Sequence, residues 1–212
     1  RYCLHPLFFK TTPGNSGGLI LDGGVVFSAS ANVTTLLNGL ITLTADSVLQ
    51  PQASGRTISV DSNIVGSAGL TIRSALSSGG AVLFNSLSNT YDGDTTVNAA
   101  GNLRLEAADV IPDGPGKGDV TVSGDLDLNG YSETINGLSG SGTVDSTAGA
   151  PVLTVGNRND TTTFDGTIQD TGGNLGLNKV GAGTLVLSAS NTYSATTAMT
   201  GTDSTTSTVD IR

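Results

Sequence analysis

Short apolar runs alternate with small polar residues along most of the chain. Within a run, apolar and polar positions usually take turns, which places one face of a β-strand inward and the other in water. Gly, Asn, Asp, Ser and Thr separate the runs, as expected for turns between strands. No long window carries a 3.6-residue apolar stripe, so helices are not expected. The pattern predicts an all-β protein of many short strands, among them residues 40–44, 56–60, 81–84, 119–123 and 184–187.

Two all-β architectures fit this pattern. A sandwich would use hairpins, and the dipeptides Asn38-Gly39, Asp113-Gly114 and Asn129-Gly130 suit tight hairpin turns. A parallel β-helix would instead stack coils of two or three short strands at a spacing of about 4.8 Å. The core candidates are mostly Val, Leu, Ile and Ala, and only 4% of residues are aromatic, which favours the β-helix.

An internal repeat also favours the β-helix. Residues 79–91 read GGAVLFNSLSNTY and residues 181–193 read GAGTLVLSASNTY, with no gap between the glycines and the tyrosine. Such self-similarity is typical of chains that stack like units along one axis. We therefore predict a parallel β-helix over residues 19–212, with repeat copies near 69–97 and 174–199.

The end of each repeat copy predicts a corner of a coil. There an asparagine amide can bond to neighbouring backbone, and the tyrosine that follows can cap the corner. The predicted corner residues are Asn89, Tyr91, Asn191 and Tyr193. These are structural roles.

Residues 1–18 differ from the rest of the chain. An apolar cluster is followed there by a loop rich in Thr, Gly and Ser, which predicts an extended N-terminal arm. An apolar arm needs a surface to cover, either its own coil end or that of a neighbour. The arm residues that we expect to take part in assembly are Tyr2, Leu4, Leu7, Phe8 and Phe9.

The net charge and the short apolar runs disfavour several classes of partner. The formal net charge of −9 comes largely from Asp, a turn residue, and it disfavours nucleic acid and anionic lipid as partners. No apolar run approaches the length of a membrane-spanning helix, so membrane insertion is not expected. The single cysteine, Cys3, cannot form an internal disulfide.

The sequence carries little catalytic chemistry. His5 is the only histidine, so a Ser-His-Asp triad or a histidine metal site lacks partners. The acidic pairs Asp92/Asp94 and Asp125/Asp127 occupy turn and strand positions that are ordinary for a solenoid. Oxygen-rich segments at 92–94, 113–119 and 125–130 lack the EF-hand pattern and are interpreted as turns rather than calcium sites. We predict no catalytic, cofactor-binding or metal-binding residue.

Several motifs resemble a known repeat family. Residues 181–193, preceded by 164–168 and 172–179, resemble the autotransporter-associated β-strand repeat, also called the passenger-associated transport repeat. Residues 89–97, NTYDGDTTV, are similar to the NTY-x-G-x-T-x-V ending of that family, and residues 125–144 are similar to the segments that join its copies. The resemblance covers residues 56–197, and the second copy departs from it with Ala195 where the family prefers glycine.

This resemblance implies a right-handed parallel β-helix, a secreted or bacterial cell-surface location and a structural or display role, without catalytic residues. We therefore expect a structural subunit of an extracellular fibre or surface passenger stalk. It would join copies of itself head to tail, through the arm or through the C-terminal strand that holds Val209 and Ile211. The alternatives are an adhesin segment that binds surface glycans or proteins and, third, a polysaccharide-active β-helix enzyme.

Overall fold

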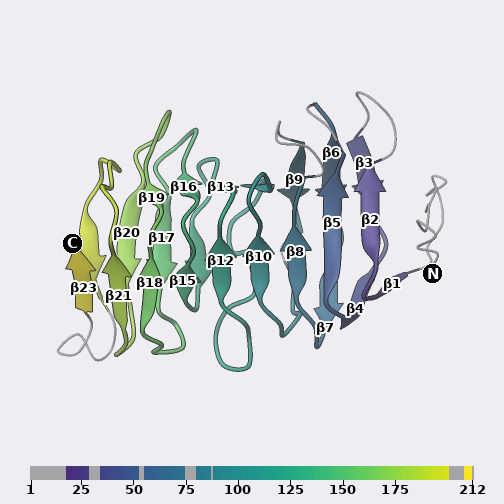
Figure 1. Ribbon diagram of the computed structural model, residues 1–212, viewed down its shortest axis with the longest axis horizontal. Coiled ribbons are helices and arrows are strands. Elements are labelled where there is room, and N and C mark those ends of the chain that lie inside the picture. The colour runs from purple at the N-terminus through teal and green to yellow at the C-terminus, as the bar shows by residue number, and fades with distance from the viewer. Residues whose placement is uncertain are drawn as a thin grey trace.

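The computed structural model describes residues 18–28, 34–52, 55–74, 80–86, 88–200 and 208–211. The part of the chain that it describes consists of strands, turns and bends, without a helix, and all strand pairs are parallel (Figure 1). The prediction of an all-β chain of stacked parallel coils is therefore confirmed, and the sandwich alternative is wrong. The predicted arm, with Tyr2, Leu4, Leu7, Phe8 and Phe9, lies almost wholly outside the described residues.

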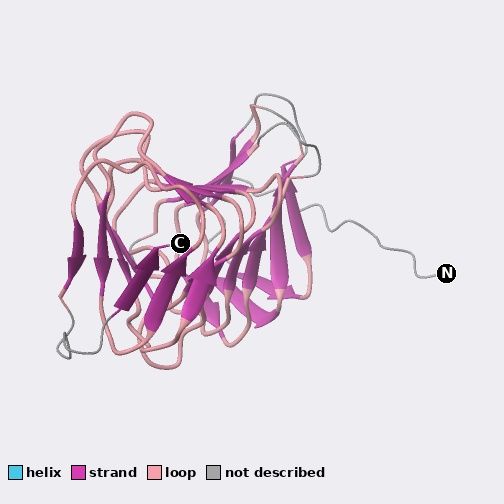
Figure 2. Ribbon diagram, turned by 60° about the vertical axis from the view of Figure 1, so that its left-hand side comes forward, coloured by secondary structure: helices cyan, strands magenta, loops and turns pink. Residues whose placement is uncertain are grey.

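The strands lie on three faces around the long axis, joined by loops (Figure 2). Face C is one sheet of β3 (Thr34–Leu37), β6 (Thr57–Val60), β9 (Ala81–Phe84), β11 (Asn102–Leu105), β13 (Asp125–Asp127), β16 (Thr143–Asp145) and β19 (Thr167–Ile168).

Face B begins with a sheet of β2 (Val25–Ser28), β5 (Ser47–Pro51), β8 (Leu70–Ile72), β10 (Thr95–Val97), β12 (Val120–Val122) and β15 (Leu138–Ser139). A parallel bridge from Gly140 to Phe164 continues this face into a second sheet. That sheet holds β18 (Thr162–Phe164), β21 (Thr184–Leu187) and β23 (Thr208–Ile211).

Face A begins with β1 (Leu19–Asp22), β4 (Ile41–Ala45) and β7 (Ile64–Gly66). Two irregular segments, 89–92 and 109–111, take the places of the next two strands, and Thr90 N–H still donates to Ile64 O at 2.8 Å. The face ends with β14 (Glu133–Ile135), β17 (Val152–Val155), β20 (Gly176–Lys179) and β22 (Thr197–Met199).

The register stacks like residues directly above one another. On face C, one inward-facing column consists of six residues that are each 0% exposed: Ile58, Val82, Leu103, Leu126, Val144 and Ile168. The outward residues next to them are small or polar except Leu83, as the alternation in the sequence predicts. Because each inner strand is covered above and below, the aliphatic core extends along the rod rather than forming one central cluster.

The two repeat copies lie on different faces. In the first copy, β9 belongs to face C and β10 to face B, whereas in the second copy β21 belongs to face B and β22 to face A. The cause is the uneven length of the coils. The two copies begin 102 residues apart, at residues 79 and 181. The coil from Thr95 to Val120 has 25 residues, whereas the next coil, from Val120 to Leu138, has 18. The 102 residues are therefore not a whole number of coils. The second copy is thus displaced by one face around the axis.

The corner between face B and face C is a stack of glycines from consecutive coils, Gly101, Gly124, Gly142 and Gly166. A Cβ added at Gly124 would collide with Gly101 O, one at Gly142 with Gly124 O, and one at Gly166 with Gly142 O. Each of these approaches is under 3.0 Å and meets backbone, which cannot move aside without displacing the neighbouring coil. Glycine is therefore required at this corner for a steric reason.

This corner generates a stability prediction. Gly142→Ala should lower the free energy of unfolding by about 1–3 kcal/mol, because the methyl group forces two coils apart. The matched control is Gly24→Ala, since no atom lies within 4 Å of a Cβ at Gly24. Urea unfolding followed by circular dichroism measures both variants. Equal stability of the two variants would contradict the steric role of the stack.

Candidate functional site

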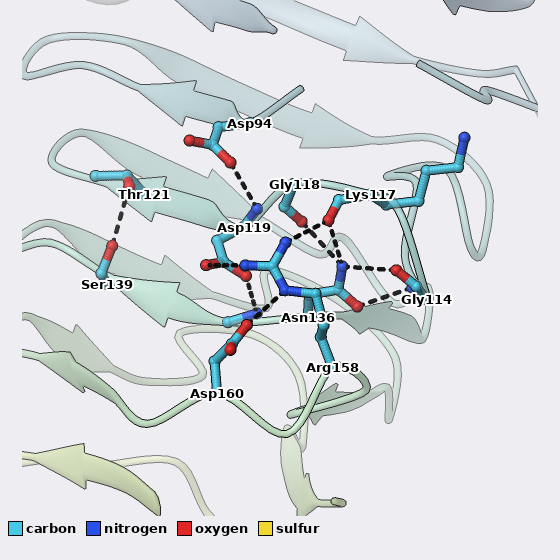
Figure 3. Close-up of polar contacts among 11 residues, drawn as sticks. Asp94, Gly114, Lys117, Gly118, Asp119, Thr121, Asn136, Ser139, Arg158 and Asp160 are labelled. Atoms are coloured by element: carbon cyan, nitrogen blue, oxygen red, sulfur yellow. Dashed lines mark hydrogen bonds and ion pairs between the residues drawn. The ribbon is translucent and has the colours of Figure 1, made fainter. Parts of the chain in front are cut away.

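The loop before β12 takes part in a cluster of polar side chains with residues of later coils (Figure 3). Arg158 lies at its centre and donates to Lys117 O at 2.7 Å, to Asp119 Oδ2 at 3.1 Å and to Asp160 Oδ2 at 2.6 Å. Burial raises the pKa of the Asp119 carboxyl, and the charge of Arg158 opposes that rise. The guanidinium thus ties the coil of β18 to the coil of β12, two coils earlier, through backbone and carboxylate together.

Asn136 closes the same loop from inside. Its Oδ1 accepts from Gly114 N–H at 2.8 Å, and its Nδ2 donates to Gly114 O, Lys117 O and Gly118 O at 3.1, 2.9 and 3.1 Å. The side chain is 1% exposed, so these bonds replace the water that the loop backbone would otherwise bind. Its amide therefore has a structural role.

Aspartate and asparagine side chains close the corner before face B on several coils. In each case Oδ1 accepts a backbone N–H one coil further on: Asp46 from Gly69 at 2.7 Å, Asp94 from Asp119 at 2.8 Å, Asp119 from Gly137 at 2.9 Å and Asn159 from Ala182 at 2.9 Å. Three aspartates of this acidic chain are thereby committed to corner hydrogen bonds.

The acidic segments considered as calcium sites have other partners. Asp92 Oδ1 binds Lys117 Nζ at 2.7 Å, and Asp127 accepts from Asn129 N–H at 2.8 Å and from Thr147 N–H at 3.1 Å. Asp113 accepts from Asn157 Nδ2. Among the described residues, no three His, Cys, Asp or Glu side chains are grouped as a metal site would require.

The two segments predicted as corners take the places of strands, the first on face A and the second on face C, and they make equivalent bonds through the asparagine Oδ1 and the tyrosine hydroxyl. Asn89 Oδ1 accepts from Ile64 N–H and Asn191 Oδ1 from Ile168 N–H, both at 2.8 Å. Tyr91 and Tyr193 each bond through the hydroxyl to a threonine four residues later, at 2.6 and 2.5 Å.

The two segments differ in whether the next coil supplies a hydrogen-bond partner. Asn89 Nδ2 donates across to Val110 O at 2.7 Å on the next coil, whereas Asn191 Nδ2 donates to Ala189 O of its own coil at 2.9 Å. Tyr91 is 1% exposed, and its burial raises its pKa. Tyr193 is only half-buried, because it lies near the C-terminal end of the stack.

This difference predicts unequal costs for the same substitution. Asn89→Ala should lower the free energy of unfolding by about 2–4 kcal/mol, because Ile64 N–H and Val110 O lose partners in a buried site. Asn191→Ala, the matched variant, should cost about 1 kcal/mol, since water can reach the exposed corner. Chemical denaturation of both variants measures the difference. A larger loss for Asn191→Ala would contradict the assignment.

Glu133 is a buried carboxyl that the sequence analysis did not identify. It lies on the inward side of β14, is 1% exposed, and accepts from Val110 N–H and Ile111 N–H, both at 3.0 Å. Burial raises its pKa to about 8, although both N–H donors favour the ionised form. The alternation of Glu133, Thr134 and Ile135 was the available signal, because it places Glu133 on the same side as Ile135.

A pH dependence follows from Glu133. Because its pKa is higher in the folded chain than in the unfolded chain, its contribution to stability is present below about pH 4.5 and is lost as the pH rises to about 8. Between pH 5 and pH 8, the free energy of unfolding of the wild type should fall by about 2–4 kcal/mol more than that of Glu133→Gln. Urea unfolding of both proteins at the two pH values tests this. Parallel losses would contradict a raised pKa at Glu133.

Lys179 is a second inward-facing ionisable residue. It is 1% exposed, and its Nζ donates to Val180 O at 2.5 Å and Gly181 O at 3.3 Å. Burial lowers its pKa. The only signal in the sequence was its alternation with Leu177, which shares the inward side of β20.

The C-terminal end of the stack exposes inward-facing apolar residues. Ile211 aligns with Leu187 and Met199 with Lys179, both of which are 1% exposed, yet Ile211 is 68% exposed and Met199 53%. A cavity of about 560 Å³ opens there, lined by Leu187, Ala189, Ser190, Asn191, Tyr193, Ala195, Thr197 and Ile211. We call this surface the open end. Two of the residues predicted for assembly, Val209 and Ile211, lie on its edge strand β23.

The first coil contrasts with the open end. Leu21 on β1 and Val26 on β2 also face inward, but they are only 4% and 5% exposed. Figure 1 shows β23 at one extreme of the rod and β1 and β2 toward the other. No helix in the described ranges has the length and apolar character needed to cross a membrane.

Comparison of the chain with protein-family models, curated proteins and solved structures gives no match. The case for a function therefore depends on the geometry described above and on the sequence motifs.

Proposed function

We propose that the protein is a secreted structural β-solenoid, a subunit of an extracellular fibre or bacterial surface stalk, that associates with copies of itself end to end. The open end is the observation that carries this proposal. It combines unpaired outer edges of β22 and β23, within the described residues, with the apolar side chains of Ile211 and Met199 at positions that the preceding coil buries. Such an edge is a template for another strand.

A second copy is the partner that fits this edge best. β22 ends face A and β23 ends face B, while β1 begins face A and β2 begins face B. The first coil of a second copy can thus continue both sheets with the parallel sense that they already have. Val209 and Ile211 would then become core positions beneath the partner's first coil.

The proposed extracellular location is supported by the sequence motifs. The resemblance of residues 56–197 to the autotransporter-associated repeat supports an extracellular or cell-surface protein. The polar clusters support a structural role, because Arg158 and Asn136 use their polar atoms to bind backbone and carboxylates of earlier coils.

The proposal predicts that one apolar residue at the open end controls assembly. Ile211→Asp should weaken self-association at least about tenfold, because a charge would have to be buried between two copies. The matched control is Val152→Asp, since Val152 is 41% exposed on the side of the rod. Light scattering after gel filtration, with negative-stain microscopy, measures assembly. Circular dichroism verifies that both variants are folded.

Rods that lengthen with concentration for the wild type and for Val152→Asp, but not for Ile211→Asp, are the expected result. Wild-type protein that stays monomeric at high concentration would overturn end-to-end association. Deletion of residues 1–10 separates the two assembly routes predicted from the sequence. Folded monomers would assign a role to the arm, and unchanged rods would leave the open end as the contact.

A further inference from the structure

The chain contains three Asn-Gly dipeptides, at Asn38, Asn129 and Asn136. In this dipeptide the glycine nitrogen can attack the asparagine side chain, because glycine has no Cβ to hinder the approach. The attack needs an asparagine side chain that can rotate and a glycine nitrogen that is not held by an acceptor. Hydrogen bonding at each dipeptide therefore decides whether it reacts in the folded protein.

Asn136-Gly137 is held at both reacting groups. The Asn136 amide has four bonds to the loop backbone, and Gly137 N–H donates to Asp119 Oδ1 at 2.9 Å. The side chain is also 1% exposed. Reaction there requires the loop to open and several buried polar groups to lose their partners.

Asn129-Gly130 is held through the asparagine. Asn129 Oδ1 accepts from Arg104 at 2.7 Å, and its Nδ2 donates to Leu105 O at 3.0 Å on the preceding coil. Tyr131 N–H closes the turn onto Leu128 O at 2.8 Å, with φ of 49° at Asn129 and 86° at Gly130. Rotation of the side chain therefore breaks two bonds between coils.

Asn38-Gly39 lacks these restraints. Asn38 is exposed at the corner between β3 and β4, and within the described residues neither its side chain nor Gly39 N–H has a hydrogen-bond partner. The described contacts hold this corner through carbonyl groups instead. Ser62 Oγ donates to Gly39 O at 2.6 Å and to Leu37 O at 3.3 Å.

We propose that Asn38-Gly39 is the deamidation site of the folded solenoid. Gly39 N attacks Asn38 Cγ, the new N–C bond forms a succinimide, and the Cγ–Nδ2 bond breaks to release ammonia, which takes the proton from Gly39 N. Water then opens the ring at either carbonyl. The products carry an aspartyl or an isoaspartyl residue at position 38, and no oxidant or enzyme is needed.

The isoaspartyl product would disturb the hydrogen bonding between the first coil and the second. It adds one atom to the backbone of the corner between residue 38 and Gly39, one residue before Leu40. Leu19 N–H donates to Leu40 O at 2.7 Å, and this bond begins the pairing of β1 with β4. A longer corner displaces Leu40 O. Deamidation at Asn38 would therefore weaken the pairing of β1 with β4, while the other two dipeptides remain unmodified.

The test is peptide mapping by mass spectrometry after incubation of the whole folded chain in mildly alkaline buffer. Asn38 should convert at least about tenfold faster than Asn129 or Asn136, because each held site reacts only after local opening. A parallel incubation in urea provides the internal control. There all three dipeptides should convert at similar rates.

A variant tests whether the hydrogen bonds to Asn129 slow its deamidation. Arg104→Ala removes one of the two side-chain bonds to Asn129 from an exposed position, so conversion at Asn129 should rise several-fold while that at Asn136 stays unchanged. Conversion of Asn129 or Asn136 as fast as Asn38 in the folded wild type would overturn the proposal. So would an Asn38 that reacts in urea but not in the folded chain.

Discussion

Backbone hydrogen bonding between successive coils is the interaction on which the rest of this structure depends. A single coil cannot bury its apolar side chains or pair its N–H and C=O groups, so it is stable only between neighbours. The parallel register then places one aliphatic residue above another, as in the column from Ile58 to Ile168. Side chains contribute by keeping adjacent coils at the spacing that these bonds require.

The corners show how that spacing is maintained where the chain must turn. At the corner between faces B and C the backbones approach so closely that only glycine fits, as Gly124 and Gly142 illustrate. At the corner before face B a carboxylate accepts an N–H from the next coil, as Asp94 and Asp119 do. An acidic sequence is therefore compatible with a stable rod, because many of its carboxylates replace backbone acceptors at turns. At the open end, the described residues place no further strand on the outer edges of β22 and β23.

The alternation of apolar and polar residues was enough to predict strands, and the repeat was enough to predict stacked parallel coils. Inward residues such as Leu103 and Leu185 follow directly from that alternation. The displacement of the second repeat copy by one face could not be predicted, because it depends on the length of every corner between the copies. Loop 112–119 lengthens one coil, and the next coil is short.

The buried ionisable residues had only a weak signal in the sequence. Glu133 and Lys179 alternate with apolar neighbours, but a polar residue in such a pattern normally marks an outward position. Only the adjacent coil supplies the N–H groups that Glu133 accepts. Asn89 and Asn191 were identifiable because the repeat marks them, whereas their unequal burial depends on which coils lie above them.

The stacking account is tested most directly by distances between spin labels on the outer side of face B. The register links Thr71 to Thr96, Thr96 to Thr121, Thr121 to Ser139, and Thr163 to Val186, with the Gly140–Phe164 bridge joining the two sheets. Five coil spacings then separate Thr71 from Val186, or about 24 Å along the axis. We predict that label distances from position 71 increase by nearly equal steps to positions 163 and 186. Distances that do not grow with the number of intervening coils would contradict the stack.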